Sequence, residues 1–325
     1  MSASPPDISE EEKRIIRTVA GEEGKGMRLD QYLARRFTYH SRSAWQESIR
    51  KGEILLNGRK TRSSRILQGE EQIDFNFPEK EEPPVRSDYI LLAEEKQYIV
   101  VSKPGNLPVH PSGRYFNHTL LMILRKKYPE LFIVNRLDRE TSGTVLLARS
   151  AKASALLCKA MEQRKIYKEY VVYVYGKFPE EPFTARGYLS ADPASPVRKK
   201  RRFTYGKPPE KECPCEECST SFSLIKQYSS LAKVCCILHS GRLHQIRATL
   251  CSLGYPVMGD KLYGLDAKIF ARFSDGKMTE EDKKLLLIDR QALHAKVLQF
   301  ESPFDGTLLT FTAPLPEELI SLEKD

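Results

Sequence analysis

An aspartate flanked by two arginines stands out among the residues of this chain that could do chemistry. Asp138 lies in the run Asn135-Arg136-Leu137-Asp138-Arg139-Glu140-Thr141-Ser142-Gly143. The apolar stretches 131–134 and 144–148 on either side predict strands, so the turn would present Asp138 at a strand edge. Nearby positive charge keeps a carboxylate ionised at neutral pH, the state that a nucleophile needs. Taken alone, the run also fits a surface turn with weak ion pairs.

The composition favours a polyanionic partner. The 325 residues include 52 Lys and Arg against 43 Asp and Glu, a net charge of +9, and such an excess attracts nucleic acids. No stretch approaches the roughly 18 apolar residues that span a bilayer. Residues 1–23 resemble neither a signal nor a transit peptide. Seven cysteines, an odd number, suit reduced thiols. We therefore expect a cytoplasmic protein.

A small first domain is predicted over residues 27–77, after a flexible tail at 1–26. Residues 28–33 begin a short amphipathic helix, and Ser41 offers an N-cap for a second helix that ends at Gly52. A strand at 53–56 leads into Asn57-Gly58, a strong hairpin signal. The acidic, proline-containing run within 78–85 has the composition of a linker.

This first segment resembles the S4 RNA-binding domain through R-L-D-x-x-L, S-R-S and I-R-x-G-x-I-x-x-N-G. The resemblance implies that Arg42, Arg50, Lys51 and Arg59 contact RNA phosphates. A solvated helix face is the alternative. Phosphate contacts position a protein without reading sequence, so these residues leave the identity of the RNA open.

The second domain is expected over residues 86–325. Strands are predicted at 89–93, 98–102, 168–176, 231–238, 293–300 and 308–312, and helical patterns at 119–127, 150–163 and 242–253. Strands with few βαβ alternations favour a mixed, mostly antiparallel sheet flanked by helices. The predicted class is therefore α+β, with a small αβ S4-like domain at the N-terminus.

Four segments in order resemble the RluA family of RNA pseudouridine synthases. Along the chain they are 101–111 (VSKPGNLPVHP), the Asp138 run, 168–176 (KEYVVYVYG) and 241–264, which opens with Gly-Arg-Leu-His-Gln-Ile-Arg. The late segment 293–303 is also similar. One such motif would be weak, but four in the family's order are specific. The resemblance covers residues 85 to 315.

The resemblance implies a role for each matching residue. Asp138 would be the catalytic aspartate that attacks the target uridine, and Arg247 the arginine that pairs with it. Tyr170 would stack on the uracil ring and take part in proton removal. Arg136 would enter the gap left by the flipped base, and Ile246 would pack near the ring. Judged without the resemblance, Tyr170 could be a core aromatic, and Arg247 could be a solvated charge or a phosphate contact.

The chemistry fits these residue types. Forming pseudouridine breaks the N1–C1′ bond and makes a C5–C1′ bond, and a carboxylate nucleophile can divide this into easier steps through an adduct with sugar or base. A guanidinium would orient and ionise that carboxylate. Extruding the uridine costs on the order of a few kcal/mol, which stacking worth about 1–3 kcal/mol can offset. No cofactor and no metal is expected.

Two positions depart from the family pattern. Asn135 stands where His is common, so titration near neutral pH is lost while a donor and an acceptor remain. Leu243 stands where Thr is usual, which suggests a packing variation. His244, in the same segment, is expected to be a structural hydrogen bonder. If position 135 only supports the loop, activity should survive.

A basic run and a cysteine cluster lie between the third and fourth segments. Lys199, Lys200, Arg201 and Arg202 could contact RNA phosphates or form a solvated loop. Cys213, Cys215 and Cys218 have a spacing that suits zinc, but three local thiols are one short of a usual site. The simpler expectation is that no metal is bound.

The leading prediction is a monomeric enzyme that converts uridine to pseudouridine in structured RNA, with ribosomal RNA favoured over transfer RNA. A non-catalytic RNA-binding or ribosome-assembly protein on the same scaffold is the alternative. A hydrolase using paired carboxylates is a third, weakened because no second acid stands out beside Asp138.

Overall fold

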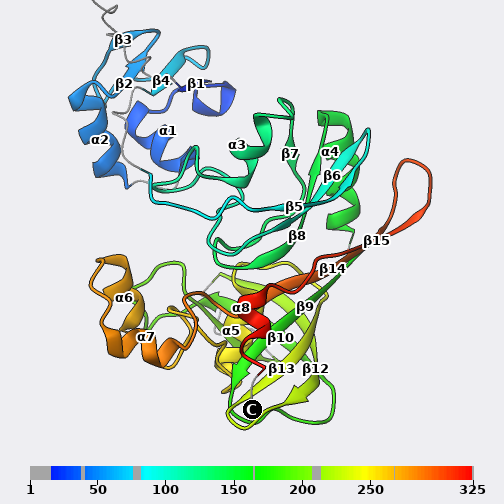
Figure 1. Ribbon diagram of the computed structural model, residues 1–325. Coiled ribbons are helices and arrows are strands. Elements are labelled where there is room, and N and C mark those ends of the chain that lie inside the picture. Colours follow the sequence, from blue (N-terminus) through cyan, green and yellow to red (C-terminus); the bar gives the residue numbers. More distant parts are fainter. Residues whose placement is uncertain are drawn as a thin grey trace, which may run out of the picture. The chain divides into compact units, whose positions relative to one another are not determined.

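The computed structural model describes residues 16–37, 41–75, 82–163, 165–206, 214–266 and 268–323, which divide into two units (Figure 1). Unit 1 holds the described residues up to Pro83 together with Ser112–Phe116. Unit 2 holds Pro84–Pro111 and the described residues from Asn117 onward. The division between Pro83 and Pro84 falls within the segment predicted as a linker. No helix of the described residues is long and apolar enough to cross a membrane.

Unit 1 combines two helices with a four-stranded sheet of order β1-β4-β2-β3. Its elements are β1 (Ile16–Val19), the 3-10 turn η1 (Glu22–Gly24), α1 (Leu29–Arg36), α2 (Arg42–Lys51), β2 (Ile54–Leu56), β3 (Arg59–Lys60) and β4 (Gln72–Phe75). The chain's single Trp, Trp45, is fully buried with Tyr32 and Leu33 between helices and sheet. This cluster gives the unit a hydrophobic core of its own.

Local signals set the second helix and the hairpin of unit 1. The Ser41 hydroxyl accepts a hydrogen bond from the Ala44 N–H at 3.2 Å, and Gly52 ends α2 in the left-handed conformation with φ 76°. Asn57 and Gly58 have φ 51° and 73°, as a type I′ turn requires. The predicted helix boundaries and the hairpin turn are therefore confirmed.

The predicted flexible tail over residues 1–26 is wrong for residues 16–26. Strand β1 pairs antiparallel with β4, from Ile16 opposite Phe75 to Val19 opposite Gln72. The Gly26 N–H then donates to the Leu67 carbonyl at 2.9 Å. Four residues of strand are too short for a periodic pattern, so the pairing with a distant strand was not visible in the sequence. Residues 1–15 lie outside the described part of the chain.

Unit 2 is built on an 11-stranded sheet of order β11-β10-β12-β13-β9-β14-β8-β6-β5, with β15 paired to β14 and β7 to β8. Its strands are β5 (Ile90–Glu94), β6 (Tyr98–Lys103), β7 (Phe132–Ile133), β8 (Ser142–Ala148), β9 (Ile166–Tyr175), β10 (Phe183–Ala191), β11 (Arg201–Tyr205), β12 (Cys215–Gln227), β13 (Leu231–Leu238), β14 (Leu293–Glu301) and β15 (Leu308–Thr312). Its helices are α3 (Leu120–Arg125), α4 (Ala151–Glu162), α5 (Gln245–Ser252), α6 (Ile269–Ser274), α7 (Glu280–Leu286) and α8 (Glu317–Ile320).

The predicted mixed, mostly antiparallel sheet is confirmed. Among the strand pairings of the described residues, only the one between β8 and β14 is parallel, and it joins two residue pairs, His294 with Ser142 and Ala295 with Gly143. Gly143 has φ 115°, and a Cβ there would lie 2.1 Å from the Ala295 carbonyl oxygen. Only glycine allows this close approach of two backbones.

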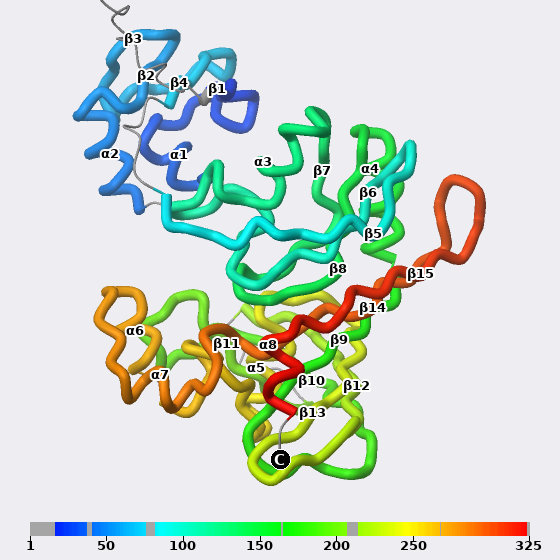
Figure 2. Tube along the Cα trace, in the orientation of Figure 1, coloured from blue at the N-terminus to red at the C-terminus, as the bar shows by residue number. Residues whose placement is uncertain are grey.

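The hairpin of β14 and β15 extends away from the rest of unit 2 (Figure 2). At the β11 end of the sheet, β10, β11 and β12 form an antiparallel set that the sequence analysis did not predict. Arg201 and Arg202 begin β11, so this half of the basic run is a strand and not a solvated loop. Its contact with RNA stays a prediction. Helices α6 and α7 were also missed, because both are short.

Candidate active site

Asp138 lies in the loop between β7 and β8, and the backbone of this loop is held on several sides. The Thr141 N–H donates to the Asp138 carbonyl at 3.1 Å and closes a turn. The next carbonyl, that of Arg139, accepts from the Leu107 N–H at 3.0 Å and from the fully buried Lys103 Nζ at 3.1 Å. The loop that carries the aspartate is therefore held by residues of the matched segment 101–111.

Asp138 faces a cleft of about 180 Å³. The lining side chains come from the aspartate loop, the start of α5, the segment leading into and through α6, and the residues just before β14: Asp138, Arg139, Glu140, His244, Arg247, Lys261, Leu262, Phe270, Phe273 and Gln291. The side chain of Asp138 keeps 29% of its surface exposed. The carboxylate can therefore be reached from this cleft.

Arg247 joins Asp138 to a second carboxylate. It lies on α5, donates from Nη1 to Asp138 Oδ2 at 2.7 Å, and binds Asp260 through Nε at 2.6 Å and Nη2 at 2.8 Å. Asp260 is fully buried and also accepts the N–H groups of Leu262 and Tyr263 at 2.9 and 3.0 Å. The predicted pair of Asp138 and Arg247 is thus brought together across 109 positions of sequence.

The charges around Asp138 favour its ionised form. Burial would raise the pKa of Asp138, but the Arg247 guanidinium, assisted by His244 and a hydrogen bond from Gln291, holds that pKa below its ordinary value. The pKa of Asp260 is also lowered, because Arg247 and two backbone N–H groups outweigh its burial. Both acids are carboxylates at neutral pH.

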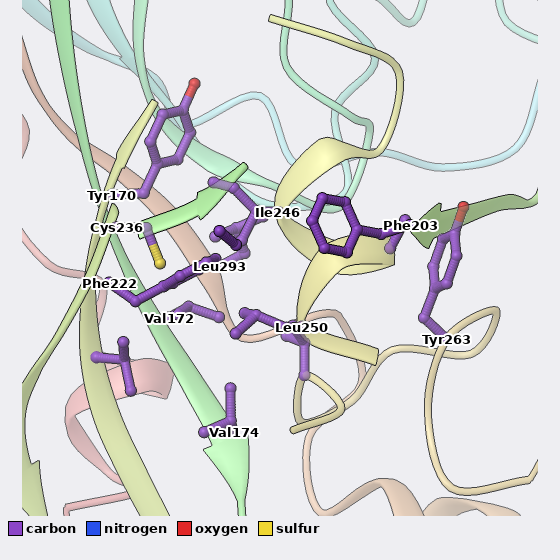
Figure 3. Packing of buried hydrophobic residues seen from close by; sticks show 14 of the residues in the cluster. Tyr170, Val172, Val174, Phe203, Phe222, Cys236, Ile246, Leu250, Tyr263 and Leu293 are labelled. Carbon is purple, nitrogen blue, oxygen red and sulfur yellow. The ribbon is translucent and has the colours of Figure 1, made fainter. Parts of the chain in front are cut away.

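Tyr170 and Ile246 belong to the hydrophobic cluster beside the site (Figure 3). Tyr170, on β9, is 7% exposed, and its hydroxyl points away from Val172 and Val174 in the figure. Burial first, and then the negative charge of Asp138, raise the pKa of Tyr170, so its hydroxyl is protonated at neutral pH. Ile246, on α5, is 4% exposed. Both predicted residues therefore lie in this hydrophobic cluster, and neither is among the residues that line the cleft.

Asn135 ties the aspartate loop to strand β8. Its Oδ1 accepts the Leu146 N–H at 2.7 Å, and its Nδ2 donates to the Thr144 carbonyl at 3.3 Å. These bonds use one donor and one acceptor and need no titration. The residue that departs from the family pattern therefore supports the loop.

Arg136 is exposed, and its positive charge acts on His110 in the matched segment 101–111. Burial lowers the pKa of His110, and the positive charges of Arg136 and Lys199 lower it further. Lys199 of the basic run and Arg136 therefore both lie close enough to His110 to lower its pKa. Within the same run, Lys200 pairs with Asp192 at 3.6 Å.

His244 is a structural element of the cleft wall. It precedes α5 in the left-handed conformation with φ 56°, and its Nδ1 lies 3.0 Å from the Tyr263 hydroxyl. Burial first, and then Arg247, lower its pKa to about 4, so the imidazole is neutral at pH 7. Leu243, beside it, is exposed.

The four predicted RNA-contacting residues of unit 1 are all exposed: Arg42, Arg50, Lys51 and Arg59. Two of them, Arg50 and Lys51, pair with Glu47 at 2.6 and 3.7 Å, and Arg42 donates to the buried Asp30 at 3.0 Å. The two exposed pairs with Glu47 are weak, so they leave Arg50 and Lys51 available to a phosphate, whereas the Arg42 pair includes a fully buried carboxylate.

The cysteine cluster is largely part of a strand. Cys215 and Cys218 lie on β12, three positions apart, so their side chains project to opposite faces of the sheet. Cys218 is buried, whereas Cys215 is half-buried. Cys213 lies outside the described residues. This strand geometry does not favour one metal held by Cys215 and Cys218 together.

Two residues of the site were missed by the sequence analysis. Asp260 is a second acid near Asp138, which the sequence analysis did not identify. It lies inside the matched segment 241–264, and only its residue type marked it as a possible site residue. Gln291 donates from Nε2 to Asp138 Oδ2 at 3.3 Å and to the Thr141 hydroxyl. An uncharged residue just ahead of a strand carries no recognisable signal.

A mostly antiparallel sheet with an aspartate–arginine pair at its cleft, in a chain with a net charge of +9, has the features of an RNA-modifying enzyme. The family described as RNA pseudouridylate synthase matches residues 97–252, and the S4 domain matches residues 27–73. The chain belongs to the RluA family of RNA pseudouridine synthases. It is an enzyme that isomerises uridine to pseudouridine in RNA, as predicted.

Two relatives illustrate the extent of the similarity. Ribosomal large subunit pseudouridine synthase D of Vibrio cholerae is 31% identical over 91% of this chain and 90% of its own length. The protein of the same name from Yersinia pestis is 31% identical over 95% of this chain and 93% of its own length. The structure of human RNA pseudouridylate synthase domain containing 1 covers 72% of this chain and 86% of its own at 20% identity, with a TM-score of 0.57. That structure supports the fold.

Proposed function

We propose that this enzyme modifies ribosomal RNA, in particular that of the large subunit, with Asp138 as its nucleophile. Relatives that match nearly the whole chain are named for the large ribosomal subunit. The S4 unit and the net charge of +9 suit a highly structured polyanion. Transfer RNA remains the second candidate substrate, because phosphate contacts alone do not distinguish the two.

The catalytic proposal rests on one observation, the 2.7 Å contact between Arg247 and the cleft-facing carboxylate of Asp138. This contact keeps Asp138 ionised and orients it, while 29% of its side-chain surface stays accessible. A carboxylate that is charged, oriented and accessible is suited to nucleophilic attack. The alternative of a non-catalytic RNA-binding or ribosome-assembly protein gives no reason for this arrangement.

Of the two possible adducts of the carboxylate, with sugar or with base, the proposed reaction takes the one with the sugar. A carboxylate oxygen of Asp138 forms a bond to ribose C1′ as the N1–C1′ bond breaks, and the bonding pair leaves with the uracil. The detached uracil rotates, and C5 attacks C1′ and displaces the carboxylate. C5 then loses its proton and N1 gains one, so the change is an isomerisation without net oxidation or reduction.

Other residues hold the flipped nucleoside. Tyr170 stacks on the uracil ring, and Ile246 packs near it. Arg136, exposed and two residues before the nucleophile, enters the vacancy in the RNA helix. These contacts offset the cost of extruding the base, which is on the order of a few kcal/mol.

The RNA contacts are assigned to two basic sets. One is Arg42, Arg50, Lys51 and Arg59 of unit 1, and the other is Lys199, Lys200, Arg201 and Arg202 of unit 2. Both sets are proposed to bind phosphates, so they set affinity and salt dependence. We further propose that the enzyme acts as a monomer in the cytoplasm, where bacterial ribosomes are made.

The decisive experiment compares pseudouridine maps of total RNA from cells that have the protein, lack it, or carry Asp138→Asn. The map should lose its signal at one or more ribosomal RNA positions in the last two cases. Asp305→Asn, an exposed acid in the β14–β15 hairpin, is the control and should restore every position. Restoration by Asp138→Asn would refute the nucleophile, and a loss confined to transfer RNA would refute the substrate.

A further inference from the structure

The two carboxylate oxygens of Asp138 have different surroundings. Oδ2 accepts hydrogen bonds from Arg247 Nη1 at 2.7 Å and from Gln291 Nε2 at 3.3 Å. Within the described ranges, no hydrogen bond of the protein reaches Oδ1. An oxygen that accepts two hydrogen bonds, one from a cation, is a weaker nucleophile than its partner, because its lone pairs are already engaged.

Gln291 is held in place by the C-terminal end of the aspartate loop, next to β8. It is 2% exposed and lies just before β14. Its amide nitrogen also donates to the Thr141 hydroxyl, and its backbone N–H donates to Glu140 Oε2 at 3.3 Å. The Glu140 carboxylate is held in turn by Lys261 Nζ, at 3.1 Å from each oxygen. The donor that meets Asp138 is therefore preorganised.

We propose that Gln291 is a positioning residue for the nucleophile: together with Arg247 it holds Oδ2 and directs Oδ1 at the uridine. This inference rests on the proposed role of Asp138. When Oδ1 bonds to C1′, Oδ2 becomes the carbonyl oxygen of an ester. That oxygen still accepts the same two hydrogen bonds, so the donors serve the free carboxylate and the adduct without reorganising.

Arg247 alone would leave this orientation incomplete. A single contact from Nη1 restrains one oxygen but permits rotation of the carboxylate about the Cβ–Cγ bond. The second donor arrives from a different element, the segment before β14, and restrains this rotation. Two donors from independent elements therefore define which oxygen faces the cleft.

The test uses two substitutions with opposite pH behaviour. Gln291→Met has a similar shape and no donor. Gln291→Glu is isosteric and can donate only when protonated, and at neutral pH it adds a negative charge beside Asp138. The charged and titratable groups that already act on Asp138 from other elements are Arg247 from α5, His244 just before α5, Tyr170 from β9, Lys103 from β6, and Tyr263. None of these is altered by either substitution.

Controls come from a second glutamine of the same unit. Gln227 donates from Nε2 to the carbonyls of Gly176, Tyr228 and Leu231 at 2.9 to 3.1 Å, and it ends β12 outside the cleft. Gln227→Met and Gln227→Glu remove comparable hydrogen bonds without touching Asp138. They report what the loss of a structural glutamine does to folding and rate.

The measured quantity is tritium released from RNA that carries [5-³H]uridine and was isolated from cells lacking the protein, at enzyme excess and between about pH 5 and pH 8. Gln291→Met should slow release about 10- to 100-fold at every pH, with RNA affinity within about twofold of wild type. Gln291→Glu should be slow near pH 8 and recover as the pH falls, because the protonated acid donates again. The Gln227 variants should keep the wild-type rate and pH profile.

The inference is overturned if Gln291→Met releases tritium at the wild-type rate, or if Gln291→Glu keeps the wild-type pH profile. If Gln291→Met does not fold, the isosteric Gln291→Glu still decides through its profile. Full activity of Asp138→Asn would instead remove the proposed nucleophile, and with it the basis of this inference, so the two failures are distinguishable.

Discussion

Arg247 and Asp260 form a doubly hydrogen-bonded ion pair, with Nε and Nη2 at 2.6 and 2.8 Å from the two carboxylate oxygens. Asp260 is completely buried, and only Nη1 of the guanidinium is left to meet Asp138. The pair therefore determines which edge of Arg247 faces the nucleophile. Through Arg247, the buried carboxylate of Asp260 therefore determines how the accessible carboxylate of Asp138 is oriented.

Asp260→Asn should lower activity about 10- to 100-fold and destabilise unit 2. Losing one partner of a buried ion pair costs about 3–5 kcal/mol when the remaining charge has no other partner, and the loss should be smaller here because Arg247 still pairs with Asp138. Urea unfolding and single-turnover rates measure the two effects. Asp266→Asn is the matched control, because Asp266 pairs with Arg272 at 2.7 Å on the surface. An Asp260→Asn enzyme with wild-type rate would show that Arg247 needs no support.

Tyr170→Phe should bind RNA as wild type does but release tritium from C5 more slowly. The ring remains for stacking, whereas the hydroxyl, protonated because the pKa of Tyr170 is raised by burial, is lost. Tyr170→Leu should weaken binding as well, by about 1–3 kcal/mol of stacking. Filter binding and tritium release separate the two effects. A wild-type release rate for Tyr170→Phe would exclude the hydroxyl from proton removal.

Asn135→Ala should destabilise unit 2 by about 1–3 kcal/mol, because the Leu146 N–H loses the acceptor that it contacts at 2.7 Å. Activity should fall with it as the aspartate loop loosens. Asn135→His keeps a donor and an acceptor and should remain active. Thermal unfolding and rate measurements on both variants test this, and equal loss in both would show that the amide itself is required.

The stability of unit 1 should fall between about pH 4 and pH 2. Burial would raise the pKa of Asp30, but hydrogen bonds from Arg28, Gln46 and Arg42 lower it to about 2. Because the folded value lies below the unfolded one, the stabilisation is complete above about pH 4 and is lost as the pH falls through the folded value. Trp45 fluorescence reports unfolding of this unit. The slope should flatten in Asp30→Asn.

Arg59→Ala should weaken RNA binding without changing the rate at saturation. Arg59 is exposed at the start of β3, and the loss of one phosphate contact should reduce the slope of log affinity against log salt by about 1. Lys177→Ala, an exposed lysine of unit 2, should leave the slope unchanged. An unchanged slope for Arg59→Ala would remove that residue from the RNA contact set.

Elements with strong local signals were predictable from sequence. The bounds of β13 and β15 agree with the predicted strands, and the Ser41 cap and the Asn57-Gly58 turn depend on neighbouring residues alone. By contrast, β1 exists because it pairs with β4, and β12 alternates too weakly over its 13 residues to reveal a strand. Long-range pairing stabilises both, and periodicity does not report it.

The same division applies to the site. Asp138 and Arg247 were found because their charges occur in distinctive runs, and the structure brings them to hydrogen-bonding distance. Asp260 and Gln291 act through partners that are 13 and 153 positions away in sequence. Their contribution depends on geometry between elements, which a single sequence does not display.

The pairing of β8 with β14 is the shortest along the main path of the large sheet in the described residues, only two residue pairs. Asp138 lies just ahead of one of these strands and Gln291 just ahead of the other. Because so few backbone hydrogen bonds join these two strands, a small change in their separation would move Asp138 and Gln291 relative to each other. The alignment of the reacting carboxylate therefore depends on the least extensive strand pairing of that path.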